Sequence, residues 1–140
     1  MMHMILLNSK DSIKYYPNNK SLDFISQLAY PLNLEGKWEI AIIDYSFKFI
    51  TPPRKSTIKI YCATCIDSND NGYNRSVLRR VYINTNLIQY REFNTPLYIP
   101  TNVNHINSLG IYIRDEDGEI TSLGLESFNC TLHLRKQNNV

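Results

Sequence analysis

Alternation of apolar and polar residues is the feature of this sequence that most constrains its fold. Residues 109–114 alternate strictly, and residues 128–135 repeat the pattern with Phe128, Cys130 and Leu132 on one side. A side-chain period of two is that of a β-strand with one buried and one exposed face. No helical apolar period is sustained over the roughly 10–12 residues that a helix needs. The pattern therefore predicts an all-β protein.

Turn-forming residues divide the chain into eight or nine short strands. The spacing of these turn signals, roughly 8–15 residues, is typical of a β-sandwich or barrel rather than of βαβ units. Strands are expected at 4–8, 37–49, 56–66, 77–84, 89–93, 97–99, 109–114 and 128–135. Residues 67–74 are expected to form a polar loop, and Asp117-Gly118 predicts a β-hairpin.

Two segments need a closer reading. Residues 21–30 fit either a strand or a short helix capped by Ser21; we favour the strand and expect Pro31 to end it. In the strand at 37–49, simple alternation places Trp38 on the core face. The same alternation places Tyr45 and Phe47 on the opposite face, outside a single core.

Length and composition limit the class of protein. At 140 residues the chain has the size of one domain, so residues 1–140 are expected to form a single unit. The net charge of +2, from 15 basic and 13 acidic residues, gives no strong field for nucleic acid. The basic spot at Arg79-Arg80 is better explained by a strand edge or an ion pair between subunits. No apolar run approaches the roughly 18 residues of a membrane helix.

The chemistry-bearing residues do not gather at recognisable spacings. Cys62 and Cys65 lack the second ligand pair of a zinc site, and residues i and i+3 of a strand point to opposite faces, so both are expected to be ordinary buried thiols. The odd count of three Cys and the absence of an export signal favour a reducing compartment. His3, His105 and His133 have no metal-ligand spacing. We expect no cofactor, no metal and no catalytic site.

Two stretches carry a resemblance to a known family. The first is Y-Y-P-N-N-K-S-L-D-F-I-S-Q-L-A-Y-P-L-N-L-E-G-K-W-E-I-A-I-I-D-Y at 15–45. The second runs from L-R-R-V at 78–81 through F-N-T-P-L-Y-I-P at 93–100 to I-Y-I-R-D-E-D-G at 111–118 and T-L-H-L-R at 131–135. Together they resemble the small structural proteins of Polinton/Maverick-type elements and adintovirus-like viruses, whose capsid proteins are jelly rolls.

The resemblance implies a capsid protein, and the length of the chain indicates which kind of capsid protein. A double jelly-roll major capsid protein needs a much longer chain, whereas an eight-stranded single jelly-roll sandwich fits here. The resemblance therefore implies the minor capsid, or penton, protein: a homopentamer at the vertices of a virion, in contact with the major capsid protein. Such a protein is made in the host cytoplasm or nucleus and is not secreted.

Candidate contact residues are those that alternation leaves outside one core. They are Tyr45, Phe47, Tyr73, Arg79, Arg80 and Tyr112. Each has an alternative explanation as loop packing or simple exposure. Two other functions stay open: a ligand- or carbohydrate-binding β-sandwich module, and another accessory virion protein of the same elements. A pocket with an exposed aromatic side chain and several polar ones would favour the ligand-binding module.

Overall fold

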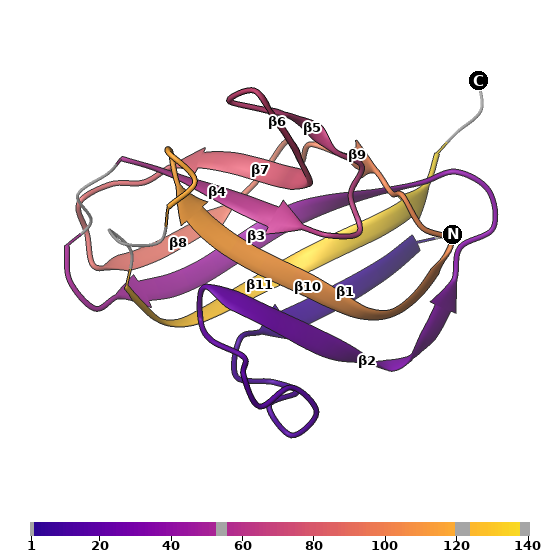
Figure 1. The fold of residues 1–140 in the computed structure, drawn as a ribbon, viewed down its shortest axis with the longest axis horizontal. Coiled ribbons are helices and arrows are strands. Elements are labelled where there is room, and N and C mark those ends of the chain that lie inside the picture. Colours follow the sequence, from indigo (N-terminus) through magenta and orange to yellow (C-terminus); the bar gives the residue numbers. More distant parts are fainter. Residues whose placement is uncertain (1, 53–55, 120–123, 138–140) are drawn as a thin grey trace.

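The computed structural model describes residues 2–52, 56–119 and 124–137, and these residues form eleven strands and no helix. Figure 1 shows two stacked sheets, with the loop between the first two strands projecting beyond them. The strands are β1 (Met2–Asn8), β2 (Asp23–Asn33), β3 (Trp38–Phe49), β4 (Thr57–Cys62), β5 (Ser68–Asp70), β6 (Tyr73–Arg75), β7 (Val77–Tyr82), β8 (Ile88–Glu92), β9 (Ile99–Pro100), β10 (His105–Asp115) and β11 (Leu125–Lys136).

The strand order is that of a jelly roll. One sheet, here called sheet A, has the order β1-β11-β3-β8, with β9 also pairing with β3. The other, sheet B, has the order β2-β10-β4-β7, and β5 pairs with β6 in a separate two-stranded ribbon. Consecutive long strands thus alternate between the two sheets except for β4 and β7, which pair with each other in sheet B, and these pairings are all antiparallel. The prediction of an all-β, eight-stranded sandwich is confirmed, with three short strands added.

The core lies between the two sheets and contains several aromatic side chains that pack against one another. Phe128 of β11 stacks on Tyr45 and Phe47 of β3, with ring centroids 6.1 Å and 5.7 Å away. Trp38 is 4% exposed, and its indole N–H donates to the carbonyl of Glu35 at 2.9 Å. The core position expected for Trp38 is confirmed. Rings of this size contribute strongly to burial, and offset or tilted packing adds to it.

The burial of Tyr45 and Phe47 corrects the alternation argument for β3. Both were expected outside the core, but they are 2% and 5% exposed and belong to it. The register shows why: Leu132 pairs with Ile42 and Thr131 with Asp44, so Ile43 is an extra residue on β3. A β-bulge of this kind resets the alternation, and every later side chain changes face.

Strand β2 settles the open reading of residues 21–30 in favour of a strand. The expectation that Pro31 ends it is wrong, because β2 continues to Asn33. The pairing with β10 is irregular near this proline: Ile106 lies opposite Leu32, while Ser108 lies opposite Gln27. β2 is also at the edge of its sheet. Proline is tolerated at such places because its missing N–H has no ladder partner to lose.

Two turns differ from their predicted roles. Residues 67–74 were expected to be loop but include the β5–β6 hairpin, whose turn residues Asn71 and Gly72 have φ of 52° and 89°. Positive φ at both positions is that of a type I′ turn, for which Asn-Gly is the preferred pair. The turn predicted at Asp117-Gly118 is present, with the Gly118 N–H donating to the Asp115 carbonyl at 3.0 Å, but β10 and β11 lie in different sheets and do not pair as a hairpin.

Candidate assembly surfaces

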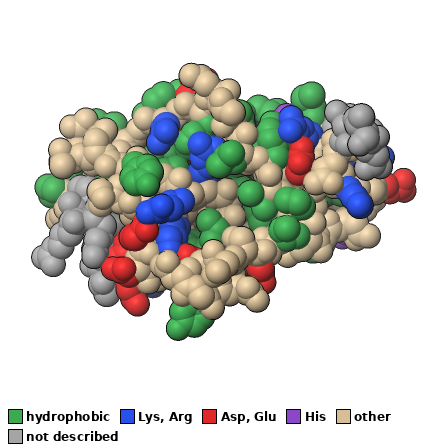
Figure 2. Space-filling view, turned by 90° about the horizontal axis from the view of Figure 1, so that it is seen from above, with side chains coloured by type: hydrophobic (Ala, Val, Ile, Leu, Met, Phe, Trp, Pro, Cys, Tyr) green, Lys and Arg blue, Asp and Glu red, His purple; other side chains and the backbone are tan. Residues whose placement is uncertain are grey.

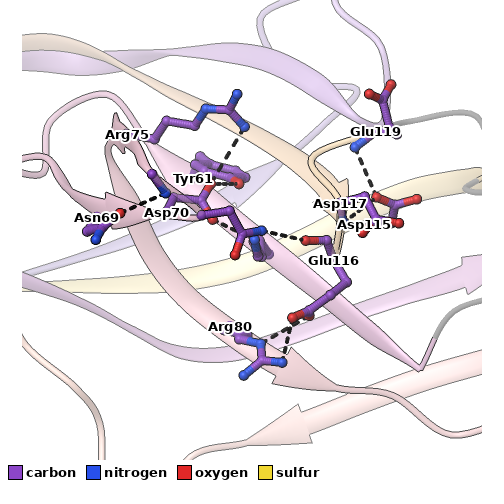
Figure 3. A network of polar contacts seen from close by, with 12 residues as sticks. Tyr61, Asn69, Asp70, Arg75, Arg80, Asp115, Glu116, Asp117 and Glu119 are labelled. Atoms are coloured by element: carbon purple, nitrogen blue, oxygen red, sulfur yellow. Dashed lines mark hydrogen bonds and ion pairs between the residues drawn. The ribbon is translucent and has the colours of Figure 1, made fainter.

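The outer surface of sheet B is covered by the β5–β6 hairpin, which a buried polar cluster holds in place (Figure 3). Lys59 Nζ of β4 lies 2.5 Å from Asp70 Oδ1 at the end of β5, and Tyr61 Oη donates to Asp70 Oδ2 at 2.5 Å. Arg75 of β6 lies 3.6 Å from the same carboxylate. The side chains of Lys59 and Asp70 are 6% and 4% exposed. Buried charges that are paired and hydrogen-bonded can be accommodated, whereas a lone one cannot.

The protonation states of this cluster follow from its contacts. Burial opposes ionisation of Asp70, but the hydrogen bonds from Lys59 and Tyr61 and the charges of Lys59 and Arg75 outweigh it and lower the pKa of the carboxyl. Burial and the Asp70 carboxylate together raise the pKa of Tyr61 to about 12. Near neutral pH the Asp70 carboxyl is therefore ionised and the Tyr61 phenol is neutral, and the cluster anchors the hairpin.

Three Arg–Tyr pairs surround this cluster. Arg75 lies over the ring of Tyr73 at 4.9 Å, Arg80 over Tyr82 at 5.3 Å, and Arg114 over Tyr112 at 5.1 Å. We call these six residues the Arg–Tyr face. Tyr73 and Tyr82 are 64% and 66% exposed, so much of the face is open to solvent. From the side that carries the hairpin, Lys and Arg side chains are interspersed with hydrophobic ones (Figure 2).

Contacts beneath the face fix several of its side chains. Tyr112 stacks on Tyr61 with ring centroids 4.6 Å apart and planes within 3°. Arg80 forms a forked ion pair with Glu116, with N···O distances of 2.6 Å and 3.1 Å. Such bidentate pairs hold the guanidinium in one orientation. Tyr and Arg side chains held in this way offer a large contact area and lose little rotamer entropy when a partner binds. Both residue types are enriched in protein interfaces.

Arg79 lies elsewhere, at the side of the sandwich where β7 and β8 are the edge strands. Its guanidinium lies 4.0 Å from the ring centroid of Phe93, and that of Arg91 lies 5.0 Å from the same ring. Burial, with a smaller effect from the charge of Arg91, lowers the pKa of Arg79. Within the described ranges neither arginine forms an ion pair. Together they cover the ring of Phe93.

The structure brings together only part of the predicted contact set. Tyr73, Arg80 and Tyr112 share the Arg–Tyr face, Arg79 lies at the β7–β8 edge, and Tyr45 and Phe47 are inside the core. The Arg80 ion pair is made within the chain. Sequence reasoning missed Arg75, Tyr82 and Arg114. All three had a detectable signal, because each lies two residues from a predicted contact residue, on the same side of a strand.

The cysteines are buried, and the histidines have partners within the fold. Cys62, Cys65 and Cys130 are free and buried. The expectation that the thiols of Cys62 and Cys65 point apart is wrong, because β4 ends at Cys62 and a turn brings them into hydrogen-bonding contact. That hydrogen bond and burial raise the pKa of Cys65. His133 bonds to the hydroxyl of Tyr98 at 2.8 Å. Across the described ranges, no three His, Cys, Asp or Glu residues could hold a metal ion.

A shallow depression lies on the loop between β1 and β2. Tyr15, which is 64% exposed, lines it together with polar residues that include Asn18, Asn19 and Lys20. Asn19 is already engaged, since its side chain exchanges hydrogen bonds with the backbone of Ile25 at 2.8 Å and 3.0 Å.

The part of the chain that the structure describes contains no helix long and apolar enough to span a membrane.

Comparison with known proteins gives a distant likeness in shape. No protein-family model matches the sequence, and no curated protein matches it. Solved structures of infectious bursal disease virus match at low similarity. A crystal structure of its viral particle has a TM-score of 0.31 and 11% identity over 97% of this chain and 31% of that one. The Gx strain structure has a TM-score of 0.32 and 12% identity over 99% and 33%. This chain spans about a third of the length of those proteins, and scores this low carry no argument about function.

Proposed function

We propose that this chain is a structural virion protein, a single jelly-roll minor capsid subunit that acts by assembly and not by catalysis. The observation that carries the proposal is the Arg–Tyr face on the outer surface of sheet B. Its side chains are held by stacking, an ion pair and the buried Lys59–Asp70 cluster, while Tyr73 and Tyr82 stay largely exposed. Rigid, exposed Tyr and Arg side chains suit a protein contact.

The architecture of the two sheets also supports this proposal. The two antiparallel sheets form a rigid block whose surfaces differ from one another, and such blocks form rings through head-to-tail contacts when the rotation between copies closes. The finer role follows the sequence resemblance: a penton-type protein of Polinton/Maverick-like elements that forms vertex pentamers and contacts a double jelly-roll major capsid protein. In that role the protein resides in the virion.

The experiment compares binding of the chain to the double jelly-roll protein of such an element. The double variant Tyr73→Ala/Tyr82→Ala removes the exposed rings of the face, and Tyr15→Ala removes an equally exposed ring elsewhere. We expect at least a tenfold weaker association for the double variant, because aromatic anchors commonly contribute 2 kcal/mol or more each when truncated, and no change for Tyr15→Ala. Equal association of all three proteins would exclude this face as the contact, and no association by wild type would refute the capsid role.

A second candidate function is a ligand-binding sandwich module, favoured by the depression at Tyr15. An exposed ring beside amide and lysine side chains is a common arrangement for sugars. A glycan array distinguishes the two proposals. Retained binding that Tyr15→Ala abolishes would support the module, and absence of binding to any glycan would remove it.

A further inference from the structure

Among the described residues the two sheets have five edge strands, and these are protected to different degrees. Natural sheets discourage edge pairing with charges, proline or bulges. In sheet B, β2 contains Pro31 and an irregular register, and β7 contains Arg79 and Arg80 next to a register shift. In sheet A, β9 contains Pro100, and β8 carries its charges only at its end, at Arg91 and Glu92, after Ile88 and Tyr90. Only β1 lacks every one of these devices: its sequence is Met-His-Met-Ile-Leu-Leu-Asn, and its seven pairs with β11 are in regular register.

β1 also presents an apolar stripe. Met2, Met4 and Leu6 alternate along it and are 64%, 53% and 76% exposed, whereas Leu7 on the other face is buried in the core. Within the described residues β1 pairs with β11 alone, so its outer N–H and C=O groups face away from the sheet. An uncharged, regular edge with exposed apolar side chains is the kind of strand that accepts another strand.

The opposite edge of the same sheet carries a matching stripe. Ile88 and Tyr90 of β8 are 71% and 68% exposed. Across the sheet, Tyr90 of β8 pairs with Ser46 of β3, and Ser46 pairs with Asn129 of β11. Thr131, two residues further along β11, pairs with Leu6 of β1. Since side chains two residues apart share a face, Leu6 and Tyr90 lie on the same outer face of sheet A. Apolar side chains at both edges therefore project from one surface.

Strand direction selects which edges fit together. All neighbours in sheet A are antiparallel, so β1 and β3 run one way and β11 and β8 run the other. A second copy placed with its β8 beside β1 continues this alternation, with antiparallel hydrogen bonds and Ile88 and Tyr90 next to Met4 and Leu6. We propose that β1 of one copy pairs with β8 of the next. This contact is heterologous and repeats around a ring, and it rests on the assembly role proposed above.

The test uses one lysine at each edge. Leu6→Lys and Ile88→Lys replace side chains that are more than 70% exposed, and Ile13→Lys is a control at an exposed apolar residue, 50% exposed, of the β1–β2 loop. In sedimentation velocity we expect wild type and Ile13→Lys to form oligomers and each edge variant to be monomeric. An equimolar mixture of the two edge variants should give dimers and nothing larger, because together they retain one intact β1 and one intact β8.

Other outcomes overturn the pairing. If Ile88→Lys assembles while Leu6→Lys does not, β1 pairs with β1 of the second copy. If both variants assemble as wild type does, or if wild type is monomeric alone, the strand edges are not the contact. The capsid role stands separately in each case, provided that wild type still binds the double jelly-roll protein through Tyr73 and Tyr82.

Cross-linking gives a second readout that does not disturb the edge charge. The native thiols are all buried, so cysteines introduced at the surface report alone. A mixture of Leu6→Cys or Met4→Cys with Ile88→Cys should yield covalent dimers on oxidation, and Ile13→Cys with Ile88→Cys should not. Equal yields from the two mixtures would contradict the pairing.

Discussion

Lys59 and Asp70 form an ion pair of 2.5 Å that is almost completely removed from solvent. It joins the middle of β4 to the end of β5 and thereby fixes the hairpin that covers sheet B. A buried pair of this kind adds little net stability compared with an apolar pair, but removing one member leaves an unpaired buried charge. The pair is therefore best understood as the element that sets where the hairpin lies.

The first prediction concerns that pair. Lys59→Met should lower the free energy of unfolding by about 3–5 kcal/mol, because it leaves the Asp70 carboxylate buried with less compensation. The double variant Lys59→Met/Asp70→Leu should be more stable than Lys59→Met, since neither charge is then left unpaired. Urea unfolding of Lys59→Met, Asp70→Leu and the double variant measures these free energies. A double variant at least as unstable as the sum of the singles would show that the two residues are not coupled.

The second prediction concerns alkaline pH. The pKa of Tyr61 is about 12 in the folded protein against an ordinary 10.0. Below pH 10 the phenol is neutral in both states and its contribution is complete; between pH 10 and about 12 only the unfolded state ionises, so stability falls. The unfolding free energy of wild type should therefore fall more steeply over this range than that of Tyr61→Phe. Parallel curves for the two proteins would contradict the burial of this phenol together with its hydrogen bond to Asp70.

The third prediction concerns the core. Trp38→Ala should lower the free energy of unfolding by about 3–5 kcal/mol, as is usual for a buried large aromatic residue. Tyr30→Ala serves as the control, because Tyr30 is 71% exposed. Denaturant unfolding of both variants gives the comparison. A loss under about 1 kcal/mol for Trp38→Ala would mean that β3 does not face the core as described.

The strands of the two sheets could be predicted from the sequence, but the faces of some side chains and the β5–β6 hairpin could not. β10 and β11 could be read directly because their alternation is unbroken over most of their length. The bulge at Ile43 could not, since an apolar residue there fits either face, and the whole error over Tyr45 and Phe47 follows from it. The β5–β6 hairpin had a signal in Asn71-Gly72, but its polar strands lack apolar alternation. The cluster of Lys59 with Asp70 depends on that hairpin and so could not be predicted either.

The fourth prediction concerns the three cysteines. Cys62, Cys65 and Cys130 are buried, and burial raises the pKa of the Cys130 thiol. Because the thiolate is the reactive form, all three should react with a thiol reagent only as the protein unfolds. Labelling in native buffer and in denaturant, followed by mass spectrometry, checks this. Rapid labelling of any thiol in the native protein would contradict the described core.

We propose that this jelly roll works by assembling with copies of itself and with a capsid partner. Sedimentation velocity of the purified wild-type chain, with negative-stain images of the main species, tests it most directly. We predict a closed ring of five subunits. A single species with the mass of one chain, unchanged when the double jelly-roll protein is added, would contradict the account.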